Sequence, residues 1–237
     1  MEGSAKKLPP GQVAIADFPR WGLPEFVRRR PKSPADPRLS LGGDVQSPCE
    51  IALHELVVLP RYEQISDLHC VTTWSRCGLR WSGYRMREFY EQIFVPRAQP
   101  DPGVEYLVLR ALDGLWTSLP LEDVLAPDVL LADRVDGEPL SVQHGAPLRL
   151  VAPAHYAFKG VKHLCGVEVV REFVDRKDWR LHPRGRVALE ERGQHLPGWG
   201  FRLIYRATLP LMLAYYRRLT REGPRPASEP SNRADIE

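Results

Sequence analysis

The sequence HCVTTWSRCGLRWSG, residues 69–83, brings together two cysteines, two glycines, two tryptophans and two arginines. Residues 65–74, ISDLHCVTTW, alternate in side-chain character with the period of two that is typical of a β-strand. This pattern predicts a strand that leads into a turn carrying Cys77. One face of the strand is expected to present Leu68, Cys70, Thr72 and Trp74.

Downstream, the spacing of apolar residues changes to that of a helix. The helical positions are Met86, Phe89, Tyr90, Ile93 and Phe94, with Ser82 as the expected N-cap. Further strands are predicted at residues 104–112, 129–135, 148–153 and 166–173, with turns at Asp113-Gly114 and Asp136-Gly137. Long helices are too few for a regular βαβ array, so we predict an α+β fold with mixed sheets and short helices.

The two ends of the chain differ from its middle. Residues 1–37 are rich in Pro, Gly and Arg and are expected to form an extended arm that wraps on the domain for part of its length. Residues 38–175 contain neither an internal repeat nor an obvious linker, which predicts one domain. Residues 176–223 are predicted to form a helical extension, and residues 224–237 a disordered tail.

Composition limits the classes of function. The chain has 237 residues, of which 43% are hydrophobic, so it can bury a substantial core. A net charge of +3, with arginines scattered among acidic residues, disfavours nucleic acid as a partner and suits a small anionic ligand. The four cysteines form no CxxC pair, so we expect reduced thiols. The N-terminal sequence lacks an apolar signal region, which predicts a cytoplasmic location.

The segment WGFRLIYRATLPLMLAYYRRL, residues 199–219, is the most apolar part of the C-terminal extension. It is apolar enough to lie on a membrane surface or on a partner protein. The favoured interpretation is an amphipathic helix that packs on its own domain.

Cys70 is the first candidate for chemistry. A cysteine at the end of a strand can present its thiolate to a soft metal from a rigid support. The alternative is a small buried hydrophobic residue, because free cysteines are among the most buried residue types.

The second candidate is HGAPLRLVAPAHYAFKGVKHL, residues 144–164. Arg149 lies within an apolar run, where an unpaired charge is costly, so we expect it to face a phosphate or a carboxylate. Lys159 and Lys162 flank Gly160, which permits close backbone approach, and can bind the same anion. The alternative for each cation is a solvated charge or a salt bridge within the protein.

Five motifs follow one another along the chain: CVTTWS at 70–75, WSG at 81–83, DGEPL at 136–140, HGAPLRLVAP at 144–153 and Y-x-x-K-x-x-K-x-L at 156–164. DG, LPL and LLA occur between the second and the third. Together these motifs resemble the molybdopterin-binding domain of the sulfite oxidase family, in its short bacterial form. The resemblance runs from about Pro37 to Glu172, which is more than half of the chain.

The resemblance implies a molybdenum-molybdopterin cofactor in which Cys70 is the protein thiolate on the metal. It also implies that His144 contacts the cofactor. Arg149 and the stretch Gly160-Val161-Lys162 are then expected at the pterin phosphate. The pterin phosphate then supplies the anion that was expected for Arg149 and for the lysines that flank Gly160.

Other residues are candidates near the implied cofactor. His155 and Tyr156 lie close enough in sequence to hydrogen-bond the pterin, and Lys159 shares the predicted anion site. Trp74 and Tyr84 are candidate walls of a substrate pocket, with core packing as the alternative for the tryptophan.

The predicted function is oxygen-atom transfer on a small substrate such as an S-oxide, an N-oxide or a sulfite-like compound, with an external protein that donates or accepts electrons. The animal and plant sulfite oxidases have an Arg-Arg pair and an Asn shortly after the cysteine, whereas this chain reads Trp74-Ser75-Arg76. Only some 65 residues follow the matched region, too few for the family's haem and immunoglobulin-like domains. The alternative function is a non-catalytic cofactor-binding or scaffold protein that retains the fold.

Overall fold

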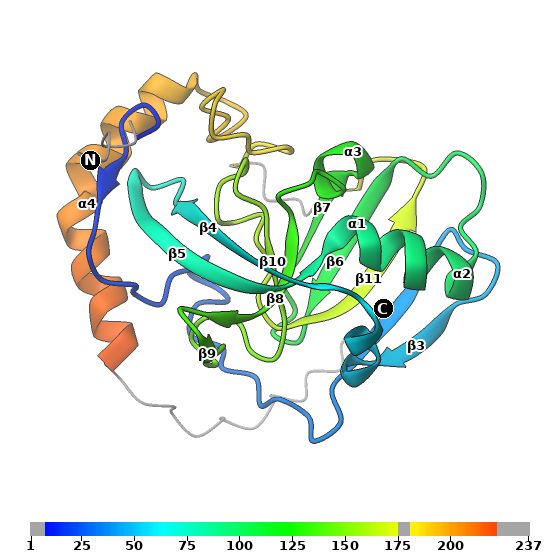
Figure 1. Cartoon of the computed structure of the whole chain (residues 1–237). Coiled ribbons are helices and arrows are strands. Elements are labelled where there is room, and N and C mark those ends of the chain that lie inside the picture. The colour runs from blue at the N-terminus through cyan, green and yellow to red at the C-terminus, as the bar shows by residue number, and fades with distance from the viewer. Residues whose placement is uncertain (1–7, 175–180, 222–237) are drawn as a thin grey trace, which may run out of the picture.

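A computed structural model describes residues 8–174 and 181–221, which form two β-sheets with helices along them (Figure 1). The predicted tail at 224–237 lies outside the described residues, as do the first seven residues of the predicted arm. Within the two described ranges, no helix is both long and apolar enough to cross a membrane.

One sheet has five strands in the order β3-β2-β11-β6-β7. β11 pairs with β2 in parallel, and the other neighbours are antiparallel. The parallel pair places the two ends of the predicted domain side by side. The strands of this sheet are β2 (Arg38–Gly43), β3 (Cys49–Ala52), β6 (Tyr106–Ala111), β7 (Trp116–Pro120) and β11 (Leu164–Val170).

The other sheet has six strands and is organised around β5. Its strands are β1 (Val13–Ala14), β4 (Arg61–His69), β5 (Trp74–Arg85), β8 (Leu130–Val135), β9 (Glu138–Pro139) and β10 (Arg149–Val151). β4 runs antiparallel along most of β5, whereas β1 pairs in parallel with its first two residues. β8 pairs with the other end of β5 and carries β9 and β10. β5 therefore holds the sheet together.

The six-stranded sheet is buried on both faces at β8 and β10. Leu131 and Leu150 belong to a first core that is shared with the five-stranded sheet. Leu130, Ala132 and Val151 belong to a second core on the opposite face. Successive side chains of a strand point to opposite faces of the sheet. Because both faces are buried here, both sets of side chains must be apolar, which explains the nearly continuous apolar runs from which these two strands were predicted.

A helical segment follows β5 and covers the first core. It consists of α1 (Met86–Phe89), a π-helical turn (Tyr90–Phe94) and α2 (Val95–Ala98). The predicted helix is confirmed, but its predicted N-cap is wrong, because Ser82 lies inside β5 and Arg85 precedes the first helical residue. The remaining short helices are a 3-10 helix, η1 (Leu53–Val58), and α3 (Leu121–Val124), and the mixed sheets with mostly short helices confirm the α+β class.

The prediction for residues 65–83 is wrong in its boundaries. The first strand ends at His69, residues 70–73 form the turn, and Trp74 begins β5. The residues expected in a turn are a strand, because β4 and β8 both provide hydrogen-bonding partners for them. This pairing outweighs the low strand propensity of the glycines in the sequence.

Both terminal segments lie on the second core. β1, from the predicted arm, is joined to β5, and Trp21 and Val27 are buried in the same core. α4 (Gly198–Arg221) lies along the outside of the six-stranded sheet (Figure 1) and buries one side, through Leu209, Leu213, Tyr216 and Leu219. An amphipathic C-terminal helix packed on its own domain is thus confirmed. The division of the chain into arm, domain and extension stays a prediction. Of the predicted helical extension at 176–223, only Gly198–Arg221 is helix, whereas residues 181–197 are turns and irregular chain and residues 176–180 and 222–223 lie outside the described residues.

Gly83 tests the packing of β5 against β8. A Cβ atom on Gly83 would lie 2.1 Å from the carbonyl oxygen of Leu131, and this backbone atom cannot yield without breaking the strand pair. We expect Gly83→Ala to lower the free energy of unfolding by about 3 kcal/mol in urea denaturation. Gly42→Ala is the matched control, because the nearest atom to its Cβ would be the Glu168 side chain at 3.9 Å. Equal losses in both variants would contradict the assigned contact.

Candidate functional site

Cys70 lies in the tight turn between β4 and β5. Its backbone N–H donates to the Trp74 carbonyl at 2.8 Å, and its carbonyl accepts from the Thr73 N–H at 3.2 Å. Thr73 has a φ of 72°, an uncommon conformation for a β-branched residue. The side chain of Gln12, from the arm, donates to the Cys70 carbonyl at 3.1 Å. The turn is therefore fixed by the sheet beneath it and by the arm.

Two further contacts hold this turn from the C-terminal part of the chain. Arg192 is buried and donates to the Val71 carbonyl at 2.5 Å and to the Pro10 carbonyl at 3.0 Å. One guanidinium thus joins the turn to the arm, so three segments far apart in sequence position the thiol.

The Cys70 thiol is buried but lines a cavity. Its side chain is 6% exposed, and its sulfur lies 3.1 Å from the Thr72 hydroxyl. Burial raises the pKa of the Cys70 thiol, so it carries its proton at neutral pH until a stronger partner displaces it.

The cavity measures about 430 Å³. The turn contributes Cys70 and Thr72, the loop after β10 contributes Gly160 and Lys162, and the arm contributes residues 20–27. α4 closes another side with Tyr205, Met212 and Tyr216. The structure thus brings together the two stretches that the sequence analysis singled out.

Two cations, Arg20 and Lys162, line this cavity together with the acidic residues Glu25 and Asp113, and a third, Arg149, lies beside the cavity at the Trp21 ring. Arg149 and Lys162 both approach the Trp21 ring, with the Arg149 Cζ 5.5 Å and the Lys162 Nζ 4.0 Å from its centroid. Arg20, the neighbour of Trp21, is buried and lines the cavity. Among the described residues, none of the three forms an ion pair, although the charge of Asp113 opposes the lowering of the pKa of Arg20 and of Lys162 by burial.

Their hydrogen bonds go to backbone carbonyls. Arg149 donates to the His144 carbonyl at 2.9 Å, and Lys162 donates to the Trp21 carbonyl at 2.6 Å. Burial lowers the pKa of Arg149 to about 9, and burial together with Arg149 and Arg20 lowers the pKa of Lys162 well below its ordinary value. Carbonyl dipoles satisfy the donors but do not neutralise the charge, so the site favours an anion.

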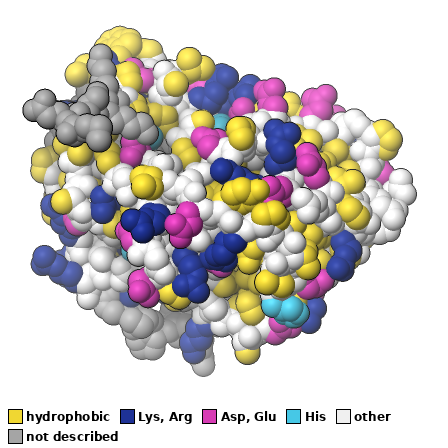
Figure 2. All heavy atoms as spheres, in the orientation of Figure 1, with side chains coloured by type: hydrophobic (Ala, Val, Ile, Leu, Met, Phe, Trp, Pro, Cys, Tyr) yellow, Lys and Arg dark blue, Asp and Glu magenta, His cyan; other side chains and the backbone are white. Residues whose placement is uncertain are grey.

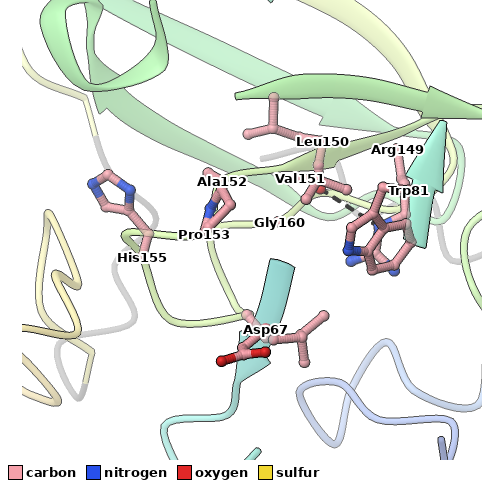
Figure 3. A pocket seen from close by; sticks show the side chains of 11 residues that line it. Asp67, Trp81, Arg149, Leu150, Val151, Ala152, Pro153, His155 and Gly160 are labelled. Carbon is pink, nitrogen blue, oxygen red and sulfur yellow. Dashed lines mark hydrogen bonds between the residues drawn. The ribbon is translucent and has the colours of Figure 1, made fainter. Parts of the chain in front are cut away.

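A second, water-sized pocket of about 20 Å³ lies behind the cavity. Figure 3 shows Arg149 beside Trp81 at one end of this pocket and His155 at the other. The Arg149 Cζ is 4.9 Å from the Trp81 ring centroid. A Cβ atom on Gly160, which lines both pockets, would lie 3.1 Å from the Leu150 carbonyl oxygen, so the backbone here packs too closely for most side chains.

His144 lies over the same group of aromatic residues. Its ring stacks on Phe18, with the centroids 4.0 Å apart, and its buried Nδ1 has no hydrogen-bond partner among the described residues. Burial first, and then the charges of Lys162 and Arg149, lower the pKa of His144 to about 3. His144 is therefore neutral at pH 7 and offers one nitrogen to a ligand.

Three of the predicted cofactor residues have contacts elsewhere. The Lys159 ammonium is buried and donates to the Thr117 hydroxyl and the Ser118 carbonyl of β7. The Val161 side chain belongs to the first core. His155 Nε2 lies 3.2 Å from Asp123, while its Nδ1 has no partner in the described part of the chain.

The two predicted aromatic walls lie far from each other. Trp74 is fully buried in the second core and meets Trp21 edge to face, with the ring centroids 5.7 Å apart. Tyr84 lies near the opposite end of β5, about 30 Å along the strand at its ordinary rise per residue. It packs at the edge of the first core and contacts Arg61. The structure does not bring Tyr84 to the cavity that holds Cys70, because β5 is extended where a turn was expected.

The donor set fits a large anionic group with a soft metal at one end. A thiol suits such a metal, three unpaired cations suit phosphate, and the buried Nδ1 of His144 and Nε1 of Trp74 lack partners within the described ranges. Arg20, Trp21 and Tyr216 were missed by the sequence analysis. The FPRWG sequence at 18–22 was the available signal, since large aromatic side chains such as Phe18 and Trp21 tend to be buried.

Comparison with known proteins agrees with this site. Residues 28–179 match the family model described as the oxidoreductase molybdopterin binding domain. The chain is 40% identical over 168 residues to the uncharacterized oxidoreductase YuiH of Bacillus subtilis, covering 70% of this chain and 80% of that protein.

The chain is also similar to enzymes with a named activity. It is 30% identical over 159 residues to the protein-methionine-sulfoxide reductase catalytic subunit MsrP of Xanthomonas axonopodis pv. citri, covering 61% of this chain and 48% of MsrP. The chain thus spans about half the length of that relative. Its fold is similar to that of the sulfane dehydrogenase SoxCD from Paracoccus pantotrophus, with a TM-score of 0.53 and 20% identity over 70% of this chain and 45% of SoxCD.

The buried histidines predict that the protein becomes less stable as the pH falls from 7 to 5. The pKa of His144 is lowered to about 3, and that of His163 to about 4, mainly by burial. An unfolded histidine titrates near pH 6.5, so below that pH the unfolded chain binds protons that the folded chain does not. The stabilisation is complete above pH 6.5, and each histidine loses about 2 kcal/mol of it by pH 5.

Urea denaturation of the cofactor-free chain at pH 7 and at pH 5 measures this loss. His144→Gln should reduce the difference between the two pH values by about 2 kcal/mol. His54→Gln is the control, because His54 is exposed in η1, and it should leave the difference unchanged. An unchanged difference in His144→Gln would show that this ring titrates normally.

Proposed function

The chain belongs to the oxidoreductase molybdopterin-binding domain family, and we propose that it removes the oxygen atom from S-oxides. It is an oxidoreductase whose cofactor is molybdenum-molybdopterin. We propose the identity of the substrate, the direction in which the oxygen atom moves, and the use of a separate electron donor. The proposed net reaction takes an S-oxide, two electrons and two protons to a sulfide and water.

One observation carries the proposal. The buried Cys70 thiol, Arg20 and Lys162 line one cavity of about 430 Å³, Arg149 lies beside it at the Trp21 ring, and none of these cations forms an ion pair within the described residues. Leaving such cations unpaired is costly, and an anionic ligand removes that cost. A structural core would instead have paired them or replaced them with apolar residues.

Within this site, each residue has a proposed role. Cys70 ligates the metal and releases its thiol proton on doing so, because metals bind the thiolate. Arg149, Lys162 and Arg20 hold the anionic part of the cofactor, and His144 donates or accepts at its free Nδ1. The bound cofactor supplies two-electron oxygen-atom transfer. The chain positions it and excludes water.

The substrate class is supported by the neighbours of the thiol. Beside its charged residues, the cavity has uncharged wall residues, Phe26 from the arm and Tyr205 and Met212 from α4, which suit a neutral S-oxide. The MsrP relative is named for methionine sulfoxide, which is such a compound. The single Arg76 after the cysteine turn donates to the adjacent Cys77 carbonyl at 2.5 Å. It is therefore already engaged, which disfavours a sulfite site built on an arginine pair.

An external electron donor and a cytoplasmic location complete the proposal. MsrP is named a catalytic subunit, which supports a separate donor protein for this chain as well. None of the four cysteines, all of which lie within the described ranges, forms a disulfide, as expected for a reducing compartment.

Cys70→Ser tests the metal ligand. Holoenzyme from a host that makes the cofactor should contain molybdenum and, after reduction by dithionite, should be reoxidised by dimethyl sulfoxide or methionine sulfoxide with formation of the sulfide. Cys70→Ser should lose at least about a thousandfold in rate while its thermal unfolding stays cooperative. Cys77→Ser is the matched control and should keep the wild-type rate, because Cys77 does not line the cavity. Metal binding without reoxidation by any S-oxide would favour the non-catalytic alternative.

Arg149→Ala and Lys162→Ala test the anion site. Each should lower the molybdenum content per protein at least fivefold, since a charge-assisted hydrogen bond to phosphate is worth about 1.5–3 kcal/mol. The rate per bound molybdenum should fall much less. Arg149→Lys should recover only part of the content, because a lysine cannot reproduce the planar fork. Arg80→Ala, exposed on β5, is the control. Normal content with a collapsed rate would instead place these cations in the substrate pocket.

A further inference from the structure

The outward side of α4 exposes a row of large apolar side chains. Trp199, Leu203 and Leu211 are 58%, 63% and 76% exposed, although the opposite side of the same helix is buried in the second core. Spacings of four and seven residues place them, with Ile204 and Tyr215, on one side over about 24 Å of helix. These five residues form the α4 outer face.

The charges of α4 all have one sign. The helix contains five arginines and neither Asp nor Glu. Arg202 and Arg217 form ion pairs with Glu190 and Asp17 of other segments. The remaining three are exposed: Arg206, Arg218 and Arg221. Over the face of the molecule in Figure 2, by contrast, cationic and acidic side chains are interspersed.

The arm adds a further cation to the same region. Arg28 is exposed, and its Cζ lies 6.0 Å from the ring centroid of Tyr215 in the α4 outer face. An apolar face bordered by arginines has the composition of helices that lie in the interface of an anionic membrane, where tryptophan is also favoured.

We propose that the α4 outer face docks the protein on an anionic lipid bilayer, with α4 parallel to the surface. The apolar side chains would enter the headgroup region, and Arg206, Arg221 and Arg28 would meet lipid phosphates. α4 has 24 residues but is not apolar enough to span the bilayer, since it contains five arginines.

Charge argues for lipid over a second copy of the chain. A two-fold contact through the α4 outer face would place the arginines of one copy against those of the other. An anionic surface attracts the same arginines, each by about 1 kcal/mol near the surface. Because Tyr205, Met212 and Tyr216 on the other side of α4 line the cavity, docking places one wall of the cofactor cavity at the membrane.

Sedimentation with vesicles tests this docking. The purified holoenzyme, full length, is mixed with phosphatidylcholine vesicles that contain none or about one third phosphatidylglycerol. We expect binding to the anionic vesicles, at least tenfold weaker binding to the neutral ones, and weakening at high salt because surface charges are screened. The readout does not depend on turnover, so its failure is distinct from failure of the proposed reaction.

Variants locate the contact. Leu203→Glu combined with Leu211→Glu should reduce binding at least tenfold without loss of folding, because both side chains are exposed. Arg206→Ala and Arg221→Ala should each weaken binding about fivefold. The matched control is Val57→Glu with Val58→Glu, since these residues are 75% and 74% exposed in η1, which follows β3 on the far side of the molecule from α4 (Figure 1). This control should bind as the wild type does.

Three outcomes would overturn the proposal. The first is equal binding to neutral and anionic vesicles. The second is no binding to either, with a wild type that stays monomeric. The third is a concentration-dependent dimer that is lost in the Leu203→Glu, Leu211→Glu variant and does not bind vesicles, which would assign the α4 outer face to a second copy.

Discussion

The pairing of β4 with β5 across the turn at residues 70–73 is the contact on which the rest of the structure depends. The turn closes with a hydrogen bond from the Cys70 N–H to the Trp74 carbonyl, and β5 then provides the edges on which β4, β8 and β1 assemble. A thiol in such a turn cannot move without disturbing the sheet. Gln12 and Arg192 add hydrogen bonds to the turn from both ends of the chain, so its geometry is set by distant segments as well as by its own sequence.

The charges beside the turn favour the binding of an anion in the cavity that Cys70 lines. Burial lowers the pKa values of Lys162, Arg149 and His144 below their ordinary values, and the charges of neighbouring cations add to the effect at Lys162 and His144. Such an arrangement is unfavourable for the chain alone and favourable with an anion present. Binding of the cofactor and stability of the fold are therefore linked, because any ligand that binds only the folded state stabilises it.

The terminal segments have a double role in this arrangement. The arm carries Arg20 and Trp21 to the cavity, and α4 closes another side while its outer face stays exposed. The Arg20 backbone N–H donates to the Thr220 hydroxyl, and the Tyr216 hydroxyl donates to the Gly22 carbonyl, so the arm and α4 are tied to each other. A site and a candidate docking surface thus share one helix.

The sequence by itself determined the α+β class, some of the strand positions, the helix after β5, and the pair of stretches that carry Cys70 and the cations. Of the strands, these positions are β4, β6, β8, β10 and β11, five of the eleven in the described residues. Apolar periodicity and local motifs encode these features, because each depends on neighbours within a few residues. It did not determine that residues 74–85 are extended, that Tyr84 lies far from the thiol, or that Val161 packs in the core. Nor did it identify Arg20 and Trp21. Those features were decided only by the tertiary structure, because strand pairing and the meeting of charges across a cavity depend on segments that are distant in sequence and adjacent only after folding.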